Sequence, residues 1–300
     1  MLYNYRYSFY KNGFYYHKLK SNISKYLLDN LHLYPNLTTL DCSDNKLTTL
    51  NLSPCINLTT LDCSDNKLTT LNLSPCVNLK QLDCSYNQLT TLNPNPCTNL
   101  EILRCFHNEL TSLDASCCDN IQELSCYNNN LTSLKSSPHA NIKIFGCCFN
   151  QIEKLDLNPY VSLEELYCSN NKLENLDLST CVNLRELYCY RNKLTTLNLS
   201  FCTDIEILHC GENYLKTLNL SFLNNLKELG CKKNYLTTLD LTNTQLQNLT
   251  HINVSDNNIS YTPNQFQILK SRNMLKYKNG DITLIDNTCS IANTSMVMVC

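Results

Sequence analysis

The chain has no tryptophan and only five glycines among its 300 residues. A doubly wound nucleotide-binding fold places glycines at its strand–helix turns, so this shortage weighs against that class of protein. The formal net charge is −2, which provides no bulk electrostatic attraction to nucleic acid or to an anionic membrane surface. No apolar run reaches the length of a membrane-spanning helix. We therefore expect no nucleic-acid partner and no membrane insertion.

The N-terminal stretch lacks an uninterrupted apolar segment. Residues 1–20 read MLYNYRYSFYKNGFYYHKLK, so we expect no secretory signal. Cysteine, by contrast, is abundant, with 20 in the chain. In a secreted chain this number would suggest a disulfide framework, whereas without a signal the expected compartment is reducing and the thiols stay free. The expectation is a cytoplasmic protein, of its producer or of an infected host cell, and secretion stays open.

The dominant feature of the sequence is a repeat. Residues 37–57 read LTTLDCSDNKLTTLNLSPCIN and residues 58–78 read LTTLDCSDNKLTTLNLSPCVN, so that they differ only at Ile56 and Val77. The 21-residue register continues through ten repeats, and an eleventh starts at Leu249. The consensus is LxxLxCxxNxLTxLxLSxCxN. A fixed period of this length predicts a solenoid that stacks one coil of chain per repeat.

The spacing within the repeat predicts the structure of each coil. If each repeat is numbered from its first leucine, positions 4 and 6 are apolar and flank a polar position 5. This alternation is typical of a strand, so each repeat is expected to add one strand to a parallel sheet. Positions 11, 14 and 16 complete the inward apolar set. The span between strands is too short and too rich in Thr, Asn and Ser for a true helix, so short extended or 3₁₀ segments are expected there.

Two polar positions recur with the period. Position 9 is asparagine in every repeat, and its amide can pair with the backbone of its own turn and of the next, which predicts an asparagine ladder. Position 6 is cysteine in ten repeats and Val254 in the eleventh. Because free cysteine behaves as a small buried hydrophobe, we interpret this row, and a second set at position 19, as cysteine ladders that serve packing. Metal ligands must converge on a point, whereas a ladder runs in a line.

The LxxLxCxxNxL run resembles a leucine-rich repeat, and the 21-residue length resembles the short bacterial and viral repeats, especially those of the cysteine-ladder internalins. The resemblance implies a right-handed, curved solenoid with the parallel sheet on its concave face, little helix outside the caps, and protein binding as its usual function. It divides the chain into an N-terminal cap (1–36), a solenoid (37–260) and a C-terminal cap and tail (261–300). The chain departs from surface-displayed internalins in having no recognisable signal or cell-wall anchor, and from ubiquitin ligase effectors in having no long catalytic domain.

The ends of the chain do not follow the repeat. The turn signal Lys11-Asn12-Gly13 between aromatic stretches predicts a β-hairpin, the alternative being a poorly ordered tail, and residues 22–30 could form a short helix. After the repeats, Thr262 and Pro263 can start a helix over 264–275. A strand is expected from Asp281 to Ile285.

Positions 3, 5, 7 and 8 should face outward from the sheet, where side chains can vary without disturbing the frame. They are mostly small or acidic in the first three repeats and change to aromatic and basic residues from the fourth, with Lys232 and Lys233 in the tenth. Tyr and Arg often dominate interface energy, so we predict a partner-binding surface. Its residues are Arg104, Phe106, His107, Tyr127, Phe149, Tyr167, Tyr188, Tyr190, Arg191 and His209. The alternative is that the rings only stack on one another across strands.

The sequence contains no recognisable catalytic constellation. The six histidines are scattered, and none has a matched nucleophile and acid or a metal-binding pair at helical spacing. The expected protein is a monomeric, non-catalytic interaction scaffold that binds a protein partner without cofactor or metal. The alternative is a secreted or surface-displayed host-recognition factor of the internalin kind.

Overall fold

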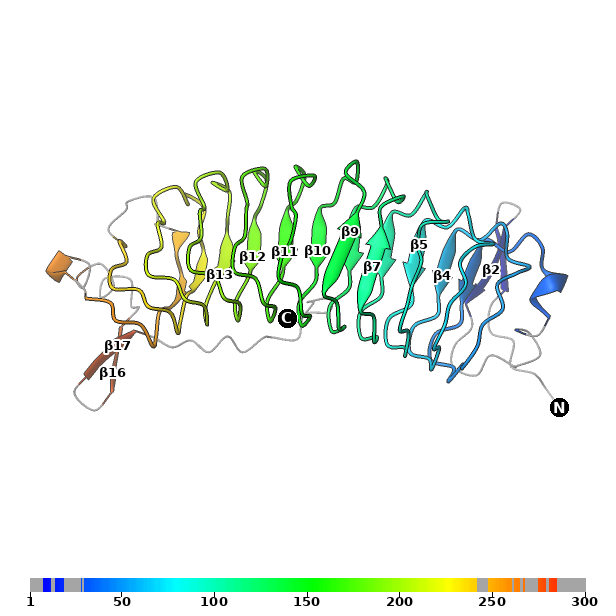
Figure 1. Ribbon diagram of the computed structural model, residues 1–300, viewed down its shortest axis with the longest axis horizontal. Helices are drawn as coiled ribbons and strands as arrows, with labels where there is room; N and C mark the ends of the chain where they lie inside the picture. The colour runs from blue at the N-terminus through cyan, green and yellow to red at the C-terminus, as the bar shows by residue number, and fades with distance from the viewer. Residues whose placement is uncertain are drawn as a thin grey trace. The chain divides into compact units, whose positions relative to one another are not determined.

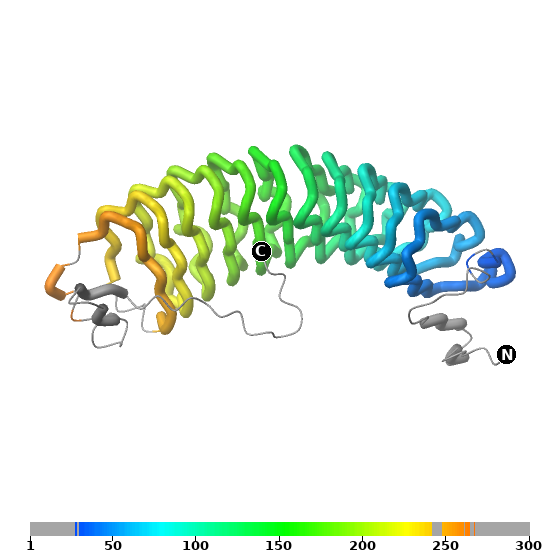
Figure 2. Tube along the Cα trace, turned by 90° about the horizontal axis from the view of Figure 1, so that it is seen from below, coloured from blue at the N-terminus to red at the C-terminus, as the bar shows by residue number. Residues whose placement is uncertain are grey.

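The computed structural model describes residues 8–11, 14–18, 28, 30–241, 248–260, 262–264, 267, 275–278 and 281–284. The chain divides into two compact units, unit 1 at residues 1–142 and unit 2 at residues 143–300. Within each unit, every repeat is one coil of the chain, and successive coils lie side by side (Figures 1 and 2).

The described elements are short strands and one turn of 3₁₀ helix, η1 (Leu31–Leu33). The strands of unit 1 are β1 (Ser8–Lys11), β2 (Phe14–Lys18), β3 (Thr39–Asp41), β4 (Thr60–Asp62), β5 (Gln81–Asp83), β6 (Ile102–Arg104), β7 (Ser112–Ala115), β8 (Glu123–Ser125) and β9 (Ser133–Ser136). The strands of unit 2 are β10 (Ile144–Gly146), β11 (Glu165–Tyr167), β12 (Glu186–Tyr188), β13 (Ile207–His209), β14 (Glu228–Gly230), β15 (His251–Asn253), β16 (Leu275–Lys278) and β17 (Asp281–Leu284).

The repeat strands pair in parallel with a register of one repeat per strand. In unit 1 the order is β2-β3-β4-β5-β6-β8 and in unit 2 it is β10-β11-β12-β13-β14-β15. Leu40 of β3 lies beside Leu61 of β4, and Leu187 of β12 beside Leu208 of β13. Each repeat position therefore forms a straight row across the sheet of its unit. The predicted parallel-sheet solenoid is confirmed.

A second, smaller sheet forms in unit 1 on the span that was expected to be extended. Strands β7 and β9 pair in parallel, with Leu113 beside Leu134 (Figure 1). They cover positions 13–16 of two successive repeats. The short extended segments predicted there are present, and in this pair they are regular enough to form a ladder.

The cysteine ladder lies in the core, as predicted. The ladder thiols from Cys42 to Cys231 are buried, and Val254, which continues the row, is buried as well. The cysteines at position 19 are equally enclosed, whereas His139, which replaces cysteine there, is exposed. Cys148 is disulfide-bonded, and the other described cysteines are free thiols.

The asparagine ladder joins each coil to the one before it. Asn87 Nδ2 donates to the carbonyl oxygens of Cys63 at 3.0 Å, Cys84 at 3.2 Å and Ser85 at 3.1 Å. Leu68 N donates to Asn87 Oδ1 at 2.9 Å. One amide thereby satisfies backbone groups of its own turn and of the preceding one, where a buried backbone group without a partner would be costly.

The exposure pattern of the cysteines predicts selective alkylation. Cys117 is exposed and its neighbour Cys118 is buried, and burial raises the pKa of the Cys118 thiol to about 12. Because the thiolate is the reactive form, iodoacetamide at neutral pH is expected to modify Cys117 far faster than Cys118. Peptide mapping by mass spectrometry measures this, with denatured protein as the control; equal rates in the folded protein would contradict it.

The ends of the solenoid are only partly described. Strands β1 and β2 form an antiparallel hairpin with Lys11 beside Phe14, and β2 pairs in parallel with β3. Most of the helix expected at residues 22–30, and of the one expected at 264–275, lies outside the described residues. Leu275, expected at the end of the second helix, instead begins β16, which pairs with β17.

Candidate interaction surface

The aspartates at position 5 of the first three repeats accept hydrogen bonds from the turns that follow their strands. The carboxylate of Asp41 accepts hydrogen bonds from Ser43 N at 3.2 Å and Ser43 Oγ at 2.7 Å, and Asp62 and Asp83 do the same with the serine two residues later. Burial raises the pKa of Asp83 above its ordinary value. These aspartates therefore fix the exit of each strand in addition to carrying charge, a role that the sequence analysis did not assign.

Four rings pack together on the outward face of unit 1, and we call them the aromatic cluster: Tyr86, Phe106, His107 and Tyr127. Tyr86 stacks on His107, and Phe106 on Tyr127, each with ring centroids 4.3 Å apart. The two pairs meet edge to face, with Tyr86 and Phe106 5.4 Å apart at 84°. Tyr86 is 46% exposed. The cluster is a rigid aromatic surface that the apolar core of the coil does not use.

His107 is held neutral within this cluster. Asn128 Nδ2 lies 3.1 Å from His107 Nε2, a contact that a neutral imidazole makes by accepting the amide hydrogen at Nε2. Burial also lowers the pKa of His107, against the opposing effect of Asp65. The ring therefore contributes a stacking face and no positive charge at neutral pH.

Arg104 lies beside the aromatic cluster and is already paired. Its Nε and Nη2 donate to Glu123 Oε1 and Oε2 at 2.8 and 2.9 Å. This bidentate geometry is the strong form of an arginine–carboxylate contact. Arg104 was predicted to meet a partner directly, and the structure gives its charge an internal partner.

In unit 2, Tyr167 departs from the prediction because it is buried, with 8% exposure. Its hydroxyl lies 2.9 Å from Glu165 Oε2 and 3.1 Å from Glu186 Oε2, and its ring stacks on Tyr188 at 5.0 Å. Burial, and then the charge of Glu165, raise the pKa of Glu186. The two flanking glutamates and Tyr188 enclose the ring, so it supports the row and is not an exposed anchor.

The other predicted residues of unit 2 do not form one cluster. Tyr188 and His209 lie in one row of the sheet, and Phe149 and Arg191 lie at position 8 of their repeats. Tyr188 lies 4.9 Å from His209, whose Nε2 is 2.8 Å from Glu228 Oε1. Gly230 follows in the same row, and an added Cβ there would contact the imidazole at 3.4 Å. Phe149 is exposed, and Arg191 pairs with Glu212. The ten predicted residues thus fall into four in unit 1 and six in unit 2.

Position 8 of the repeat has a backbone conformation that the sequence analysis missed. Its φ is positive at Asp44, Asp65, Tyr86, His107, Asn128, Phe149, Asn170, Arg191, Glu212, Lys233 and Asp256. Residues other than glycine seldom occupy this left-handed region, and Asn and Asp are the usual exceptions. The recurrence of Asp and Asn at this position was the signal that could have revealed the turn. The backbone bend at position 8 therefore fixes the direction in which an aromatic or cationic side chain at this position leaves the chain.

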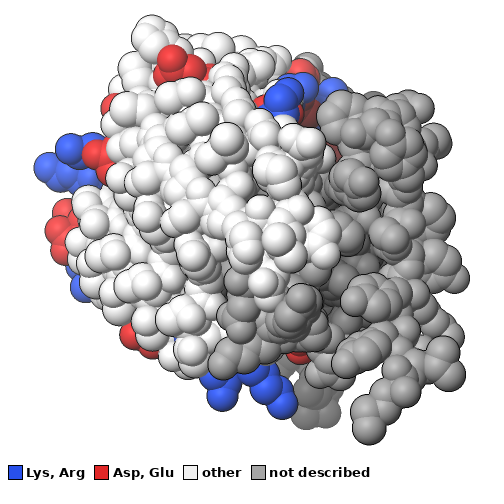
Figure 3. Space-filling model, turned by 90° about the vertical axis from the view of Figure 1, so that its right-hand side faces the viewer, with Lys and Arg blue, Asp and Glu red and all other residues white. Residues whose placement is uncertain are grey.

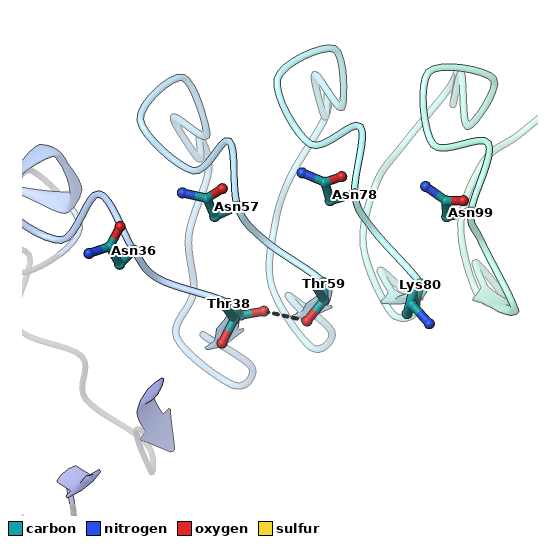
Figure 4. Close-up of a pocket in the computed structure, with 7 residues that line it drawn as sticks. All are labelled: Asn36, Thr38, Asn57, Thr59, Asn78, Lys80 and Asn99. Atoms are coloured by element: carbon teal, nitrogen blue, oxygen red, sulfur yellow. Dashed lines mark hydrogen bonds between the residues drawn. The ribbon is translucent and has the colours of Figure 1, made fainter. Parts of the chain in front are cut away.

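A shallow polar groove of about 570 Å³ lies along another edge of unit 1 (Figure 4). It is lined by Asn36, Thr38, Asn57, Thr59, Asn78, Lys80 and Asn99. Asn78 Nδ2 donates to Ile56 O at 3.1 Å, and Thr59 Oγ1 donates to Thr38 O at 3.0 Å. Asn57, Thr59 and Asn78 form a second, exposed ladder between coils. Lys80 is paired with Glu101 and none of the lining residues is buried, so we do not assign a ligand to this groove.

On the face seen in Figure 3, charged side chains occur in small groups among mostly uncharged residues. Across the part of the chain that the structure describes, no three His, Cys, Asp or Glu side chains are placed to hold a metal ion. Within the same residues, no helix has the length and apolar character to cross a bilayer.

Comparison with known proteins agrees with the geometry of the coils. A family model described as "Leucine Rich repeats (2 copies)" matches residues 35–75, 56–97 and 161–200. The chain is a leucine-rich repeat solenoid. Its repeats are 21 residues long and carry buried cysteine and asparagine ladders. A search of curated proteins found no match to this leucine-rich repeat chain.

Several solved leucine-rich repeat structures are similar to this one. The functional domain of InlJ from Listeria monocytogenes, which includes a cysteine ladder, is 34% identical with a TM-score of 0.75, over 77% of this chain and 52% of that one. YopM from Yersinia pestis, a leucine-rich effector protein, is 27% identical with a TM-score of 0.66, over 77% of this chain and 65% of that one. This chain therefore spans about half of the InlJ chain and just under two thirds of YopM.

Proposed function

We propose that this protein is a non-catalytic binding module that engages a protein partner through the outward face of its parallel sheet. The observation that carries the proposal is the aromatic cluster of unit 1. Its rings occupy positions that hold Asp and Ser in the first two repeats, so the solenoid folds without rings there. Aromatic side chains are enriched where interfaces concentrate their binding energy.

The alternative is that the rings only stabilise one another. A stacked or edge-to-face pair contributes about 0.5–1.5 kcal/mol, so the contacts within the cluster do have structural value. They leave Tyr86 46% exposed, however, and Phe106 and Tyr127 are only partly covered. An exposed aromatic surface of this kind on a soluble frame favours a contact site.

Affinity capture with matched variants tests the proposal. We expect Phe106→Ala/Tyr127→Ala to reduce recovery of the specific partner at least about tenfold, the effect of losing an interface anchor. Thr195→Ala/Thr196→Ala, at exposed positions outside the sheet, is the control and should recover the partner as wild type does. If the aromatic variant keeps its thermal stability and recovers the same proteins in the same amounts, the sheet face is not the binding surface.

A second candidate is a secreted or surface-displayed protein that recognises a host cell. It is favoured by the 34% identity to the InlJ functional domain, which shares the cysteine ladder. The free thiols of the two ladders favour a reducing compartment for this chain, whereas the disulfide at Cys148 favours an oxidising one. Fractionation tests the second candidate, which requires the protein outside the producing cells or on their surface and not in the cytoplasm of a host cell.

A further inference from the structure

Three positive side chains of unit 2 gather around a single carboxylate, and we call them the basic cluster: Arg191, Lys232 and Lys233. Arg191 Nε lies 2.9 Å from Glu212 Oε2. Lys232 Nζ and Lys233 Nζ lie 3.6 and 3.9 Å from Glu212 Oε1. Three cations against one anion leave an excess of two positive charges at this place.

These cations retain hydrogen-bonding capacity. The lysine distances exceed the 2.7–2.9 Å typical of charge-assisted hydrogen bonds, so neither ammonium is fully engaged by Glu212. Arg191 uses its Nε, and its two Nη groups make no hydrogen bond to the described residues. The side chains of all three are about half exposed, whereas that of Glu212 is only 19% exposed. A ligand would therefore meet the cations first.

Glu212 stays ionised, and its negative charge attracts the three cations. Its pKa is lowered by the hydrogen bond and charge of Arg191, and further by Lys233 and Lys232, against the opposing effect of burial. Gly211 precedes it, and an added Cβ there would lie 3.0 Å from Lys232 O. Between Tyr190 and Lys232, the row at position 7 thus has no side chain to cover the cluster.

The surroundings limit the kind of anion that fits. Asp256 occupies position 8 of the repeat that follows Lys233, and it would repel a ligand that carries charge along its whole length. Nucleic acid carries one phosphate per nucleotide and needs an extended positive surface. A polypeptide can place two or three carboxylates at one point and neutral side chains on either side. The cluster is therefore matched to a local group of carboxylates.

We propose that the basic cluster binds an acidic segment of the partner protein, with Asp or Glu carboxylates seated on Arg191, Lys232 and Lys233. This rests on the proposed function and adds the chemistry of the partner to it. Exposed ion pairs contribute about 0.2–1 kcal/mol each, so the cluster orients and selects the partner, while other contacts supply most of the affinity.

Fluorescence anisotropy with the 300-residue protein and a labelled peptide that carries three adjacent glutamates between neutral residues tests the proposal. We expect Lys232→Gln/Lys233→Gln to weaken binding about threefold to tenfold, in line with two lost ion pairs. Glu212→Gln should strengthen it about threefold, because the internal competitor is removed while the cations remain. A purely structural role for the cluster predicts no gain from Glu212→Gln, so this variant discriminates between the two explanations.

Lys172→Gln/Lys216→Gln, at two exposed lysines of unit 2 away from the cluster, is the matched control and should bind as wild type does. Circular dichroism verifies that every variant is folded. The proposal is overturned if the peptide does not bind, if Lys232→Gln/Lys233→Gln binds equally well, or if Glu212→Gln weakens binding. It is also overturned if the cluster binds a single-stranded oligonucleotide or phosphatidylserine vesicles more tightly than the peptide.

The outcome can be separated from that of the proposed function. Loss of peptide binding in the basic-cluster variant, together with unchanged partner capture by Phe106→Ala/Tyr127→Ala, would retain the acidic-segment site and reject the aromatic surface of unit 1. The reverse pattern would retain the aromatic surface and reject the acidic segment.

Discussion

Raising the pH above about 9 is expected to unfold the solenoid, because its buried thiols cannot ionise in the core. Burial raises the pKa of Cys42, Cys147 and Cys210 from the ordinary value of 9.0 to about 12. Between these values the unfolded chain has lost the thiol protons and the folded chain still holds them. The free energy of unfolding therefore falls as the pH rises, by ~1.4 kcal/mol per pH unit for each such thiol.

The contribution of each buried thiol is complete below pH about 9 and is lost as the pH approaches its folded pKa. Many buried thiols contribute together. The free energy of unfolding lost over about one pH unit therefore exceeds the total stability of an ordinary domain. Ionisation of lysines and tyrosines also acts in this range, and a matched variant is needed to isolate the thiols.

Valine at three rungs provides that variant, since Val254 already occupies the same row and is buried. Cys63→Val/Cys84→Val/Cys105→Val removes three thiols whose pKa values are raised by burial. It should lower the alkaline slope of the unfolding free energy by about 4 kcal/mol per pH unit. Circular dichroism across a pH series, with urea melts at each pH, measures this. Identical slopes in the two proteins would show that the cysteine ladder does not control alkaline stability.

Replacing one inner asparagine is expected to destabilise the solenoid by about 2–4 kcal/mol, because a buried backbone N–H loses its acceptor and two buried carbonyls each lose one of two donors. In Asn87→Ala, Leu68 N loses its acceptor at 2.9 Å. The carbonyls of Cys63 and Cys84 lose Asn87 Nδ2 and keep the amides of Asn66 and Asn108. The loss falls on two neighbouring coils at once. It therefore weakens the interface on which a solenoid depends, since no single repeat is stable alone.

Asn78→Ala is the matched control because it removes the same side chain from an exposed position. Asn78 makes one hydrogen bond, to Ile56 O at 3.1 Å, and water can replace it, so the expected cost is below about 1 kcal/mol. Urea unfolding of both variants and wild type gives the comparison. Equal destabilisation of the two would mean that the inner asparagines do not join the coils in the way the structure indicates.

The solenoid of this protein could be predicted because the same residue pattern recurs in every repeat. Leu40 and Leu61 occupy the same repeat position and lie side by side in the sheet, so a row inferred from the sequence is a row in space. The burial of the cysteine and asparagine positions follows from the same period. The aromatic cluster could be predicted for a related reason, since Phe106 and Tyr127 are one repeat apart and stack.

The details that could not be predicted depend on contacts between side chains at different repeat positions of neighbouring coils. Tyr167 was expected to be exposed, but Glu165 and Glu186 at another repeat position reach its hydroxyl. Tyr86 was left out of the predicted surface, yet it stacks on His107 of the next repeat. Such contacts depend on rotamers and on the positive φ at position 8, and the spacing of residues along one repeat does not specify them.

The register of the asparagine ladder determines which changes in chain length this protein can tolerate. The carbonyl of Cys42 accepts a hydrogen bond from Asn66, and that of Cys63 accepts the same bond from Asn87. If one whole repeat were lost, Cys42 would meet Asn87 and every later bond would re-form. A change of one or two residues must instead be absorbed within a single coil, as the two extra residues of the tenth repeat are, because Asn257 Nδ2 still donates to Cys231 O at 3.0 Å. Because residues 37–57 and 58–78 are nearly identical, unequal recombination between their coding segments is a route by which related chains can gain or lose coils without losing the fold.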